Sequence, residues 1–382
     1  MNVLVIPSWY PSGKDKLMGI YHKEFCEALV SKNINVNMLF IERERLNNPI
    51  KYLFMKKEYR IDEKGYDTYV KRMLNVDKIS FDWQLKRYVK ALDKAFKKYL
   101  EKNKKPDIIH AMVSIPAGYA ACIIGKKYKI PVVITEHASY FKRFFEGKNK
   151  EYGEIVLNNA TFTTVSNYMA KEMNEYKKNC KVLPNVVDTE IFKKERKKIK
   201  ELKLITVSAL RQGKRIDDII KSLKLLIEEH QDLKAKLTVV GDGFLENYYK
   251  NKCHELKMDE YVSFVGRKTK EEIADLLTKH NIFVIASEKE TFCIPGVEAL
   301  ASGMPVIATK CLGPEEYIDD SCGKLVEVGN MKELATAIYE VYQNIDKYDR
   351  KHLQSIASSY SKEEVAKKAI KIYQEILEKD SV

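Results

Sequence analysis

The chain has 382 residues, of which 45% are apolar and 32% are charged. This length fits two domains of about 100–200 residues each, and the apolar fraction is sufficient for two cores. No apolar stretch approaches the roughly 18–20 residues of a membrane-spanning helix, and residues 1–6 enter a strand-like pattern without the basic region of a signal peptide. Length and composition thus exclude a protein with apolar transmembrane helices and predict a cytoplasmic one.

The formal net charge of +13 is concentrated in the first half of the chain. Residues 1–190 hold 34 Lys and Arg against 22 Asp and Glu, whereas residues 191–382 hold 33 against 32. A basic surface attracts anionic partners, so one interpretation is peripheral contact with the inner face of the plasma membrane or with a phosphorylated acceptor. The other is a solvated, lysine-rich face. No nucleic-acid-binding motif accompanies the charge, so we expect no nucleic-acid partner.

The cysteines give no sign of a structural framework. Seven are scattered along the chain without a C-x-x-C pair or a Cys/His cluster, so neither a set of disulfides nor a zinc site is predicted.

Taken in order, the first half alternates short apolar runs with helical patterns. Continuous apolar strands separated by helices are typical of a parallel sheet covered on both faces. Helices are predicted at Ile20–Ser31 and, from apolar residues at helical spacing, at Phe81–Tyr99. Between them, Tyr52–Met73 carries a turn signal and predicts a hairpin-like excursion. The predicted strands are Asn2–Ile6, Ile34–Ile41, Asp107–Ala111, Pro131–Thr135, Thr161–Val165 and Lys181–Leu183.

The second half resumes this alternation after a basic run at Lys193–Lys200, which we interpret as an interdomain connection. Its predicted strands are Leu202–Ser208, Leu237–Gly241, Val262–Gly266, Ile282–Ser287 and Pro305–Thr309, and its predicted helices are Arg215–His230, Phe244–Leu256, Lys270–Lys279 and Gly296–Ala301. Ser361 and Glu364, at capping-box spacing, then begin a last amphipathic helix. We therefore predict an α/β protein with two doubly wound domains at 1–187 and 188–360, and a helix at 361–382 that returns to the first domain.

The most specific motif is Glu290-Thr-Phe-Cys-Ile-Pro-Gly-Val-Glu298, followed by Ala-Leu-Ala-Ser-Gly-Met-Pro-Val-Ile. It spans a predicted strand–loop–helix turn, and Pro295 suits the first turn of the helix. Amides at a helix start can hold phosphate oxygens, while Glu298 and Glu290 can accept hydrogen bonds from ribose and sugar hydroxyls. The alternative is that both glutamates only favour a helix N-terminus electrostatically.

This motif resembles the E-x7-E element of the retaining glycosyltransferases of GT-B architecture, of the glycosyltransferase family 4 (group 1) type. The resemblance extends over nearly the whole chain: Val239-Val-Gly-Asp-Gly243 resembles the family's V-G-x-G segment, and Pro184-Asn-Val-Val-Asp188 its P-N-G-V-D segment. It implies two Rossmann-like domains facing a central cleft. The first is expected to bind the acceptor and the second a nucleotide diphosphate sugar.

The resemblance also implies roles for single residues. His137, after a predicted strand, matches the histidine beside the transferred sugar, and Gly19 matches a glycine of the loop near the diphosphate. Lys214 matches the phosphate-binding lysine, so His137, Glu290 and Lys214 are the predicted catalytic residues. The predicted donor-binding residues are Gly19, Arg211, Lys214, Gly241, Gly266, Arg267, Phe292, Cys293, Ile294 and Glu298.

Three positions depart from the family pattern. The usual G-R-L-x-x-x-K segment has Ala209 at its arginine position, so Arg211 either supplies the missing guanidinium or is a solvated loop residue. Cys293 replaces a glycine common in the E-x7-E loop, and Asn281 stands where aspartate is usual, which we interpret as a structural change only.

Two further features of the first half each have two possible interpretations. His110 lies at another predicted strand end and is either functional or structural. The basic-aromatic stretch Tyr140–Phe145 either faces an acceptor or lipid headgroups or packs as part of a lid.

The expected reaction needs no metal or other cofactor, because the chain has no D-x-D sequence and no clustered metal ligands. Lys214 and helix-end amides would instead neutralise the leaving diphosphate. The resemblance implies retaining transfer from a UDP- or GDP-linked sugar to a glycan, lipid-linked or small-molecule acceptor, in the synthesis of cell-surface polysaccharide or glycoconjugate. The alternatives are a sugar-nucleotide 2-epimerase, an inverting enzyme of the same architecture, and a catalytically silent sugar-nucleotide-binding subunit.

Overall fold

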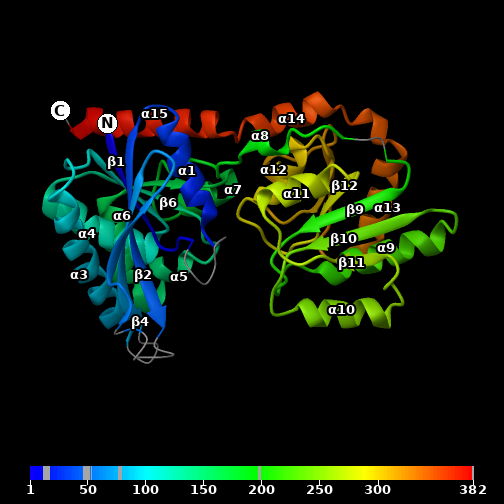
Figure 1. Ribbon diagram of the computed structural model, residues 1–382, viewed down its shortest axis with the longest axis horizontal. Helices are drawn as coiled ribbons and strands as arrows, with labels where there is room; N and C mark the ends of the chain where they lie inside the picture. Colours follow the sequence, from blue (N-terminus) through cyan, green and yellow to red (C-terminus); the bar gives the residue numbers. More distant parts are fainter. Residues whose placement is uncertain (12–17, 46–51, 53, 76–79, 197–198, 381–382) are drawn as a thin grey trace. The chain divides into compact units, whose positions relative to one another are not determined.

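The structure is a computed structural model that describes every residue of the chain except 12–17, 46–51, 53, 76–79, 197–198 and 381–382. Two compact units are present, one of residues 1–186 and 362–382 and the other of residues 187–361 (Figure 1). Each junction lies one residue from the position expected from the sequence. Both units are α/β sheets with helices packed on them, which confirms the predicted fold class.

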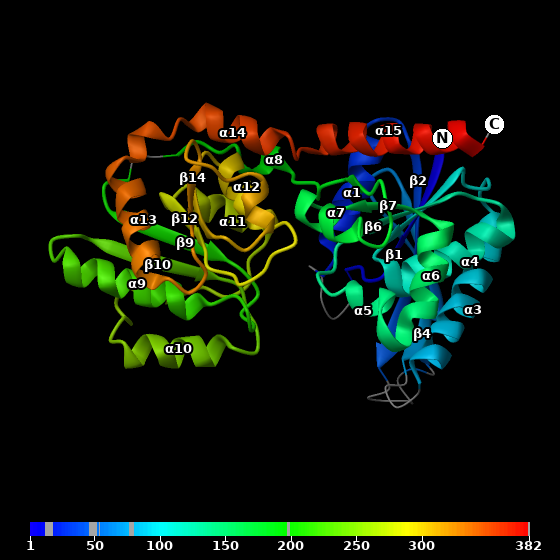
Figure 2. The same cartoon turned by 180° about the vertical axis from the view of Figure 1, so that it is seen from behind.

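The described part of the first unit is built on an eight-stranded sheet in the order β3-β4-β2-β1-β5-β6-β7-β8. The strands are β1 (Asn2–Pro7), β2 (Asn35–Arg45), β3 (Glu58–Asp62), β4 (Asp67–Asn75), β5 (Ile108–Met112), β6 (Val132–Glu136), β7 (Thr161–Thr164) and β8 (Lys181–Val182). The helices are α1 (Ile20–Val30), α3 (Phe81–Leu100), α4 (Tyr119–Tyr128), α5 (Lys142–Phe145), α6 (Lys150–Asn159), α7 (Asn167–Met173) and α15 (Lys362–Asp380). Helices α1 and α15 lie together on one face of the sheet, and α3, α4 and α6 lie on the other (Figure 2).

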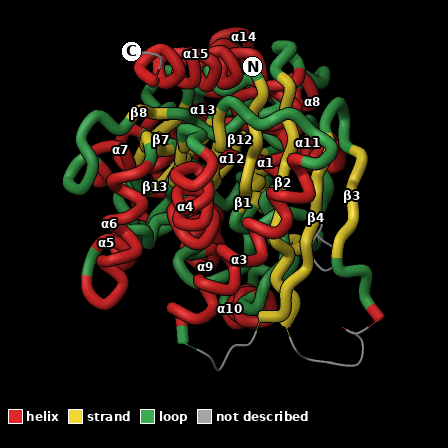
Figure 3. Tube along the Cα trace, turned by 90° about the vertical axis from the view of Figure 1, so that its left-hand side faces the viewer, coloured by secondary structure: helices red, strands yellow, loops and turns green. Residues whose placement is uncertain are grey.

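The predicted excursion at Tyr52–Met73 is largely part of this sheet. Strand β3 pairs antiparallel with β4, and β4 pairs parallel with β2, so that the three lie side by side at one edge (Figure 3). Gly65, with a φ of +85°, lies in the turn between β3 and β4. Residue 53 of that stretch lies outside the described residues. The sheet is therefore parallel except for β3 at its edge.

Helix α15 belongs to the core of the first unit. Val365, Ala369 and Tyr373 are buried against Phe25 and Leu29 of α1. The Tyr373 hydroxyl also lies 2.5 Å from Nδ1 of buried His110 on β5. The end of the chain thus completes the hydrophobic face that α1 alone leaves uncovered.

The second unit has a six-stranded, wholly parallel sheet in the order β11-β10-β9-β12-β13-β14 among its described residues. The strands are β9 (Leu202–Val207), β10 (Ala235–Val240), β11 (Val262–Phe264), β12 (Ile282–Ile285), β13 (Val306–Thr309) and β14 (Gly323–Val326). The helices are α8 (Thr189–Phe192), α9 (Ile216–Glu229), α10 (Glu246–Glu255), α11 (Lys270–Leu277), α12 (Ile294–Ala301), α13 (Met331–Gln343) and α14 (Arg350–Ser358). Helix α9 packs against α10 and α13, whereas α12 packs against α8 and α14.

Two sequence interpretations in this unit are resolved by its contacts. The basic run Lys193–Lys200 lies inside the second unit rather than between the units, although residues 197–198 fall outside the described part. One of its members, Arg196, donates its guanidinium hydrogen bonds to the carbonyls of Gly303 and His280. Asn281 is structural, because its side chain donates to the Glu201 carbonyl and accepts from the Lys203 amide, both at 2.8 Å.

Candidate active site

The candidate site of the second unit lies where its strand order reverses. From β9 the chain continues to β10 and β11 on one side, whereas β12 lies on the other side of β9. Open α/β sheets bind ligands at the carboxyl ends of the strands that flank such a switch point. The loop after β9 carries Lys214, and the loop after β12 carries Glu290. Their Nζ and Oε1 atoms are 2.5 Å apart although the residues are 76 positions apart, so the structure brings two predicted catalytic residues together.

Glu290 is held in place by both its side chain and its backbone. The Ser287 hydroxyl donates to Glu290 Oε1 at 2.7 Å. The Glu290 amide donates to the Cys311 carbonyl at 2.8 Å, and the Glu290 carbonyl accepts from the Gly313 amide at 3.0 Å. The side chains of Lys214 and Glu290 remain 14% and 13% exposed. A fixed carboxylate and a cation that both reach solvent can bind hydroxyls and phosphate oxygens, respectively.

The E-x7-E loop enters α12 through an unusual backbone conformation. Cys293 has a φ of +68°, in the left-handed region that favours glycine, the residue expected here from the motif that this loop resembles. The Tyr317 hydroxyl donates to the Cys293 carbonyl at 2.8 Å and fixes this turn. Burial raises the pKa of the Cys293 thiol well above its ordinary value, so this group stays protonated and is a poor nucleophile.

Phe292 and Ile294, two other predicted donor-binding residues of this loop, differ in which of their atoms a ligand can reach. The Phe292 side chain is 1% exposed and packs against the rings of Tyr317 and Tyr360, at centroid distances of 5.9 and 5.2 Å. The Phe292 side chain therefore belongs to the core, and the predicted donor contact at this residue is left to its backbone. Ile294 begins α12, where the first N–H groups have no partner within the helix and are available to an anion.

Glu298 lies within α12 and is 4% exposed. Its Oε1 atom is 3.6 Å from Nζ of Lys270. Burial raises the pKa of the Glu298 carboxyl, and the neighbouring Lys270 opposes that rise. A buried carboxylate beside a lysine is suited to accept further hydrogen bonds from ligand hydroxyls.

The loops after β10 and β11 supply three of the remaining predicted residues of this unit, Gly241, Gly266 and Arg267. Gly241 has a φ of +128°, and a Cβ atom there would lie 1.9 Å from the Ser208 carbonyl oxygen. The Gly241 amide also donates to the Gly266 carbonyl at 2.9 Å, which joins the two loops. Arg267 Nε lies 3.0 Å from Asp242 Oδ1. Arg211, in the loop after β9, is exposed, and its guanidinium forms no ion pair with the described residues. That it replaces the arginine missing at Ala209 stays a prediction.

In the first unit, Gly19 and His137 follow the carboxyl ends of β1 and β6. Gly19 has a φ of +76°, and a Cβ atom there would lie 2.9 Å from the Trp9 carbonyl oxygen. The intervening residues 12–17 are outside the described part of the chain. Before His137, the buried Glu136 carboxylate accepts from the amides of Ser114, His137 and Ala138 at 2.8–2.9 Å, so it ties the ends of β5 and β6 together.

His22 is a residue of this region that the sequence did not single out. Its ring centroid is 5.1 Å from that of His137, and both of its nitrogens are buried without a hydrogen-bond partner among the described residues. Burial lowers the pKa of His137 to about 3, against the effect of Asn185, and lowers that of His22 as well. A cavity of about 10 Å³ beside both rings has room for one water. The one sequence signal that could have identified His22 is its position three residues after Gly19.

His110, by contrast, is satisfied on both sides. Its Nε2 atom lies 2.7 Å from the Thr135 hydroxyl, and Nδ1 lies beside the Tyr373 hydroxyl. This histidine is structural, and of the two interpretations left open by the sequence the structure supports that one.

Two family profiles match the chain in succession. Residues 18–191 match "Glycosyltransferase Family 4", and residues 187–357 match "Glycosyl transferases group 1". The chain belongs to the family 4 (group 1) glycosyltransferases. The resemblance inferred from the E-x7-E motif is thereby confirmed, and so is the assignment as a glycosyltransferase enzyme.

This glycosyltransferase has relatives that match most of its length. It is 26% identical over 301 residues to N-acetyl-alpha-D-glucosaminyl L-malate synthase of Bacillus anthracis. This match covers 72% of this chain and 76% of that protein. It is 25% identical over 358 residues to the putative teichuronic acid biosynthesis glycosyltransferase TuaC of Bacillus subtilis, covering 88% of each. Among solved structures, Anabaena HepE in complex with UDP-glucose superposes with a TM-score of 0.71 at 17% identity, covering 98% of this chain and all of that one.

Two negative findings apply to the part of the glycosyltransferase that the structure describes. None of its helices combines the length and the apolar character needed to cross a bilayer. It also contains no group of three or more His, Cys, Asp or Glu side chains placed to hold a metal ion.

Proposed function

We propose that this glycosyltransferase takes a sugar from a UDP- or GDP-linked donor and transfers it with retention of configuration. The observation that carries the proposal is the Lys214–Glu290 pair at the switch point between β9 and β12. It sets a cation suited to a diphosphate beside a carboxylate suited to sugar hydroxyls, next to the start of α12. The complex of the Anabaena relative with UDP-glucose supports a nucleotide sugar as the donor.

In the proposed reaction, the bond between the anomeric carbon and the diphosphate oxygen breaks. A bond from an acceptor hydroxyl forms on the same face, and the hydroxyl proton passes to the leaving diphosphate. Negative charge grows on that diphosphate in the transition state, where Lys214 and the N–H groups at the start of α12 would stabilise it. Glu290 would orient the sugar through its hydroxyls, and His137, neutral because burial lowers its pKa, would offer an uncharged imidazole.

We propose further that the reaction is independent of metal ions, since Lys214 and helix-end amides can carry out the charge neutralisation that a divalent ion performs elsewhere. Turnover is expected to persist in EDTA. Loss of turnover on chelation, restored by Mg²⁺ or Mn²⁺, would overturn this part of the proposal, whereas a modest stimulation by these ions would not.

The experiment that tests the function is a donor panel. Release of UDP or GDP is measured from UDP- and GDP-sugars with candidate acceptors, and the anomeric configuration of the product is read by proton NMR. We expect one nucleotide class to be consumed and the donor's configuration to be retained. An inverted product indicates an inverting enzyme, and an epimerised free sugar indicates a 2-epimerase. Binding without turnover for every donor indicates a silent subunit, and each of these outcomes contradicts the proposal.

For the acceptor, we propose a glycan or lipid-linked glycan of cell-surface polysaccharide or glycoconjugate synthesis, held at an anionic membrane. The first unit, with 39 Lys and Arg against 25 Asp and Glu, carries a charge of +14, and the second, with 28 against 29, carries −1. A basic unit of this charge is attracted to anionic lipid. The match to TuaC over 88% of both chains supports a polysaccharide acceptor.

The membrane contact we propose is an aromatic-basic patch at the start of α3 and at α5. Phe81, Trp83 and Tyr140 are 39%, 41% and 46% exposed. Arg87 lies over the Trp83 ring at 4.4 Å, and Arg143 lies over the Tyr140 ring at 4.1 Å. Aromatic rings beside arginines suit the headgroup region of a bilayer. Lys142, in the same Tyr140–Phe145 stretch, is less suited to such a contact, because it pairs with Glu172 and Glu175 at 3.2 and 3.3 Å.

A further inference from the structure

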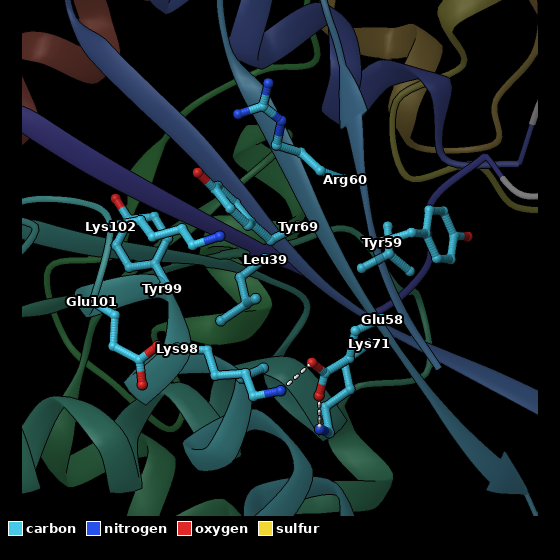
Figure 4. A pocket seen from close by; sticks show the side chains of 12 residues that line it. Leu39, Glu58, Tyr59, Arg60, Tyr69, Lys71, Lys98, Tyr99, Glu101 and Lys102 are labelled. Carbon is cyan, nitrogen blue, oxygen red and sulfur yellow. Dashed lines mark hydrogen bonds and ion pairs between the residues drawn. The ribbon is translucent and has the colours of Figure 1, made fainter. Parts of the chain in front are cut away.

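A groove runs along the edge of the first unit, between the β3–β4 hairpin and the C-terminal half of α3 (Figure 4). It consists of two adjoining hollows of about 530 and 600 Å³. Both are lined by Arg60, Tyr99 and Lys102, so they form one elongated depression. Each hollow is within the size range of about 300–1,000 Å³ that is typical of ligand sites.

The floor of the groove is the partly exposed ring of Tyr69, which rests on Tyr99, itself only 3% exposed. The rings of Tyr69 and Tyr99 meet edge to face with centroids 5.4 Å apart. The Asn103 amide donates to the Tyr69 hydroxyl at 3.1 Å, and the Asn37 amide donates to the Tyr99 hydroxyl at 3.3 Å. Because the Tyr69 side chain is already fixed, a ligand that binds on its ring loses little of its binding energy to ordering the protein.

The walls of the groove are polar but nearly neutral in charge. Lys71 and Lys98 both pair with Glu58 at 2.5 Å (Figure 4). Arg60 pairs with Asp67 at 3.2 Å. Together the two hollows have five basic and four acidic lining residues: Arg60, Lys71, Lys98, Lys102 and Lys104, and Glu58, Asp62, Asp67 and Glu101. Such a balance does not favour an anion over a neutral ligand.

Four asparagines bring amide groups to the groove, and part of their hydrogen-bonding capacity is already used, since Asn35 donates to Asn2, Asn37 to Tyr99 and Asn103 to Tyr69. Asn2, Asn35, Asn37 and Asn103 line the second hollow. Each side-chain amide offers both an N–H₂ donor and a carbonyl acceptor. Hydroxyls, which both donate and accept, suit the amide groups that these bonds leave to a ligand.

The groove is separate from the residues assigned to sugar transfer in this unit. Asn35 and Asn37 begin β2 and Asp67 begins β4, so the second hollow lies at the amino ends of these parallel strands. Gly19 and His137 follow the carboxyl ends of β1 and β6. Because the strands are parallel, the residues of the second hollow and the pair Gly19 and His137 lie at opposite ends of the strands.

We propose that this groove binds a neutral carbohydrate chain, as a site distinct from the one that carries out transfer. Sugar hydroxyls pair with a wall that mixes donors and acceptors, and the apolar C–H face of a pyranose ring packs on the ring of Tyr69. Two adjoining hollows suit a chain of several sugars better than a single sugar. The site would hold a glycan to the enzyme away from the reacting atoms, and it requires no turnover, so it stands independently of the proposed reaction.

The test is affinity electrophoresis of the full-length protein through gels that contain dextran, mannan, galactan or polygalacturonate. We expect at least one of the three neutral polymers to retard the protein. The double variant Arg60→Ala/Lys102→Ala removes two exposed donors from the groove and is expected to weaken that binding about tenfold or more, as for lost hydrogen bonds to charged groups. Tyr69→Ala, which removes the floor, is expected to abolish it.

The matched control is Lys90→Ala/Lys94→Ala, which removes two exposed charges from α3 outside the groove and should leave retardation unchanged. Three outcomes overturn the proposal: no retardation by any neutral polymer, equal retardation of the groove variant and the wild type, and retardation by polygalacturonate alone. The last outcome would assign the groove to an anion.

Discussion

Gly241 and Gly266 both have positive φ angles at the ends of neighbouring strands, yet the space around them differs. A Cβ atom at Gly241 would collide with the Ser208 carbonyl at 1.9 Å, whereas at Gly266 it would meet nothing within 4 Å. Gly241→Ala is therefore expected to lower the free energy of unfolding by about 3 kcal/mol or more. Gly266→Ala should cost only the left-handed backbone strain of about 1–2 kcal/mol. Urea unfolding followed by circular dichroism measures the loss of unfolding free energy in both variants. Equal losses would contradict the close approach of Gly241 to the Ser208 carbonyl.

Burial of three histidines makes the stability of the first unit depend on pH. Burial lowers the pKa of His110 and His137 to about 3, and that of His22 well below its usual value. Below about pH 6.5 the unfolded chain therefore binds more protons than the folded one, and the free energy of unfolding falls as the pH drops. Each histidine contributes up to about 1.4 kcal/mol per pH unit. Burial raises the pKa of Glu136, which acts in the opposite direction but as a single group.

We expect this loss between pH 6.5 and 5, measured by urea unfolding at a series of pH values. Both tryptophans of the chain, Trp9 and Trp83, belong to the first unit, so tryptophan fluorescence follows that unit alone. His22→Gln removes one titrating group and should reduce the slope by about one proton. An unchanged slope in this variant would show that His22 is not buried as a neutral imidazole.

At the scale of elements, the attachment of α15 to the first unit has a specific polar component. The Tyr373 hydroxyl lies 2.5 Å from Nδ1 of buried His110. Tyr373→Phe leaves that nitrogen without a partner and is expected to cost about 1–3 kcal/mol of unfolding free energy. The control is Tyr88→Phe, because the Tyr88 hydroxyl is buried without a partner among the described residues, and its removal should be neutral or slightly stabilising. The same tryptophan signal compares them, and equal effects would argue against the hydrogen bond.

The elements that the sequence predicted well are those buried on both faces. Strands β1 and β12 are continuous apolar runs, and such runs have few other solutions in a parallel sheet. Strand β14 was missed, because half of its four residues are only partly buried at the sheet edge. The excursion at Tyr52–Met73 was recognised as a hairpin but not as a sheet edge, since pairing between β4 and β2 is not encoded in either strand alone.

In the candidate site, too, residues in local motifs were predicted and residues placed by long-range packing were not. Lys214 and Glu290 were found because each lies in a local motif, and the structure adds that they meet. Phe292 was assigned to the donor because it lies in the motif, but its side chain packs on Tyr317 and Tyr360, which are 25 and 68 positions away. His22 approaches His137 only through the folding of the sheet. Local patterns thus identified the residues, and long-range packing decided which side chains are available.

At the scale of the whole molecule, the uneven charge predicts where the enzyme works. With +14 on the first unit, we expect co-sedimentation with vesicles containing anionic phosphatidylglycerol at low salt, and little with neutral phosphatidylcholine vesicles. Each well-placed Lys or Arg contributes about 1 kcal/mol. Binding should weaken at high salt, because the Debye length falls from about 10 Å at 0.1 M to 3 Å at 1 M.

The contribution of the aromatic-basic patch can be separated from that of charge alone. Trp83→Ala/Tyr140→Ala removes two interfacial rings and should weaken vesicle binding several-fold, whereas Tyr248→Ala, 50% exposed in the second unit, should not. Equal sedimentation with neutral and anionic vesicles would show that the basic residues form a solvated face without affinity for anionic lipid. That outcome would favour a soluble acceptor.

The measurement that bears most directly on the proposed site is the turnover of Lys214→Ala and Glu290→Gln with whichever donor the panel identifies. If the pair acts on the transition state, each substitution should cost about 3–4 kcal/mol of barrier and lower kcat roughly 100- to 1,000-fold, with the fold intact by circular dichroism. Glu288→Gln, two positions away and paired with Arg215 instead, should stay close to wild type. Near-normal kcat in either Lys214→Ala or Glu290→Gln would contradict the assignment of the site.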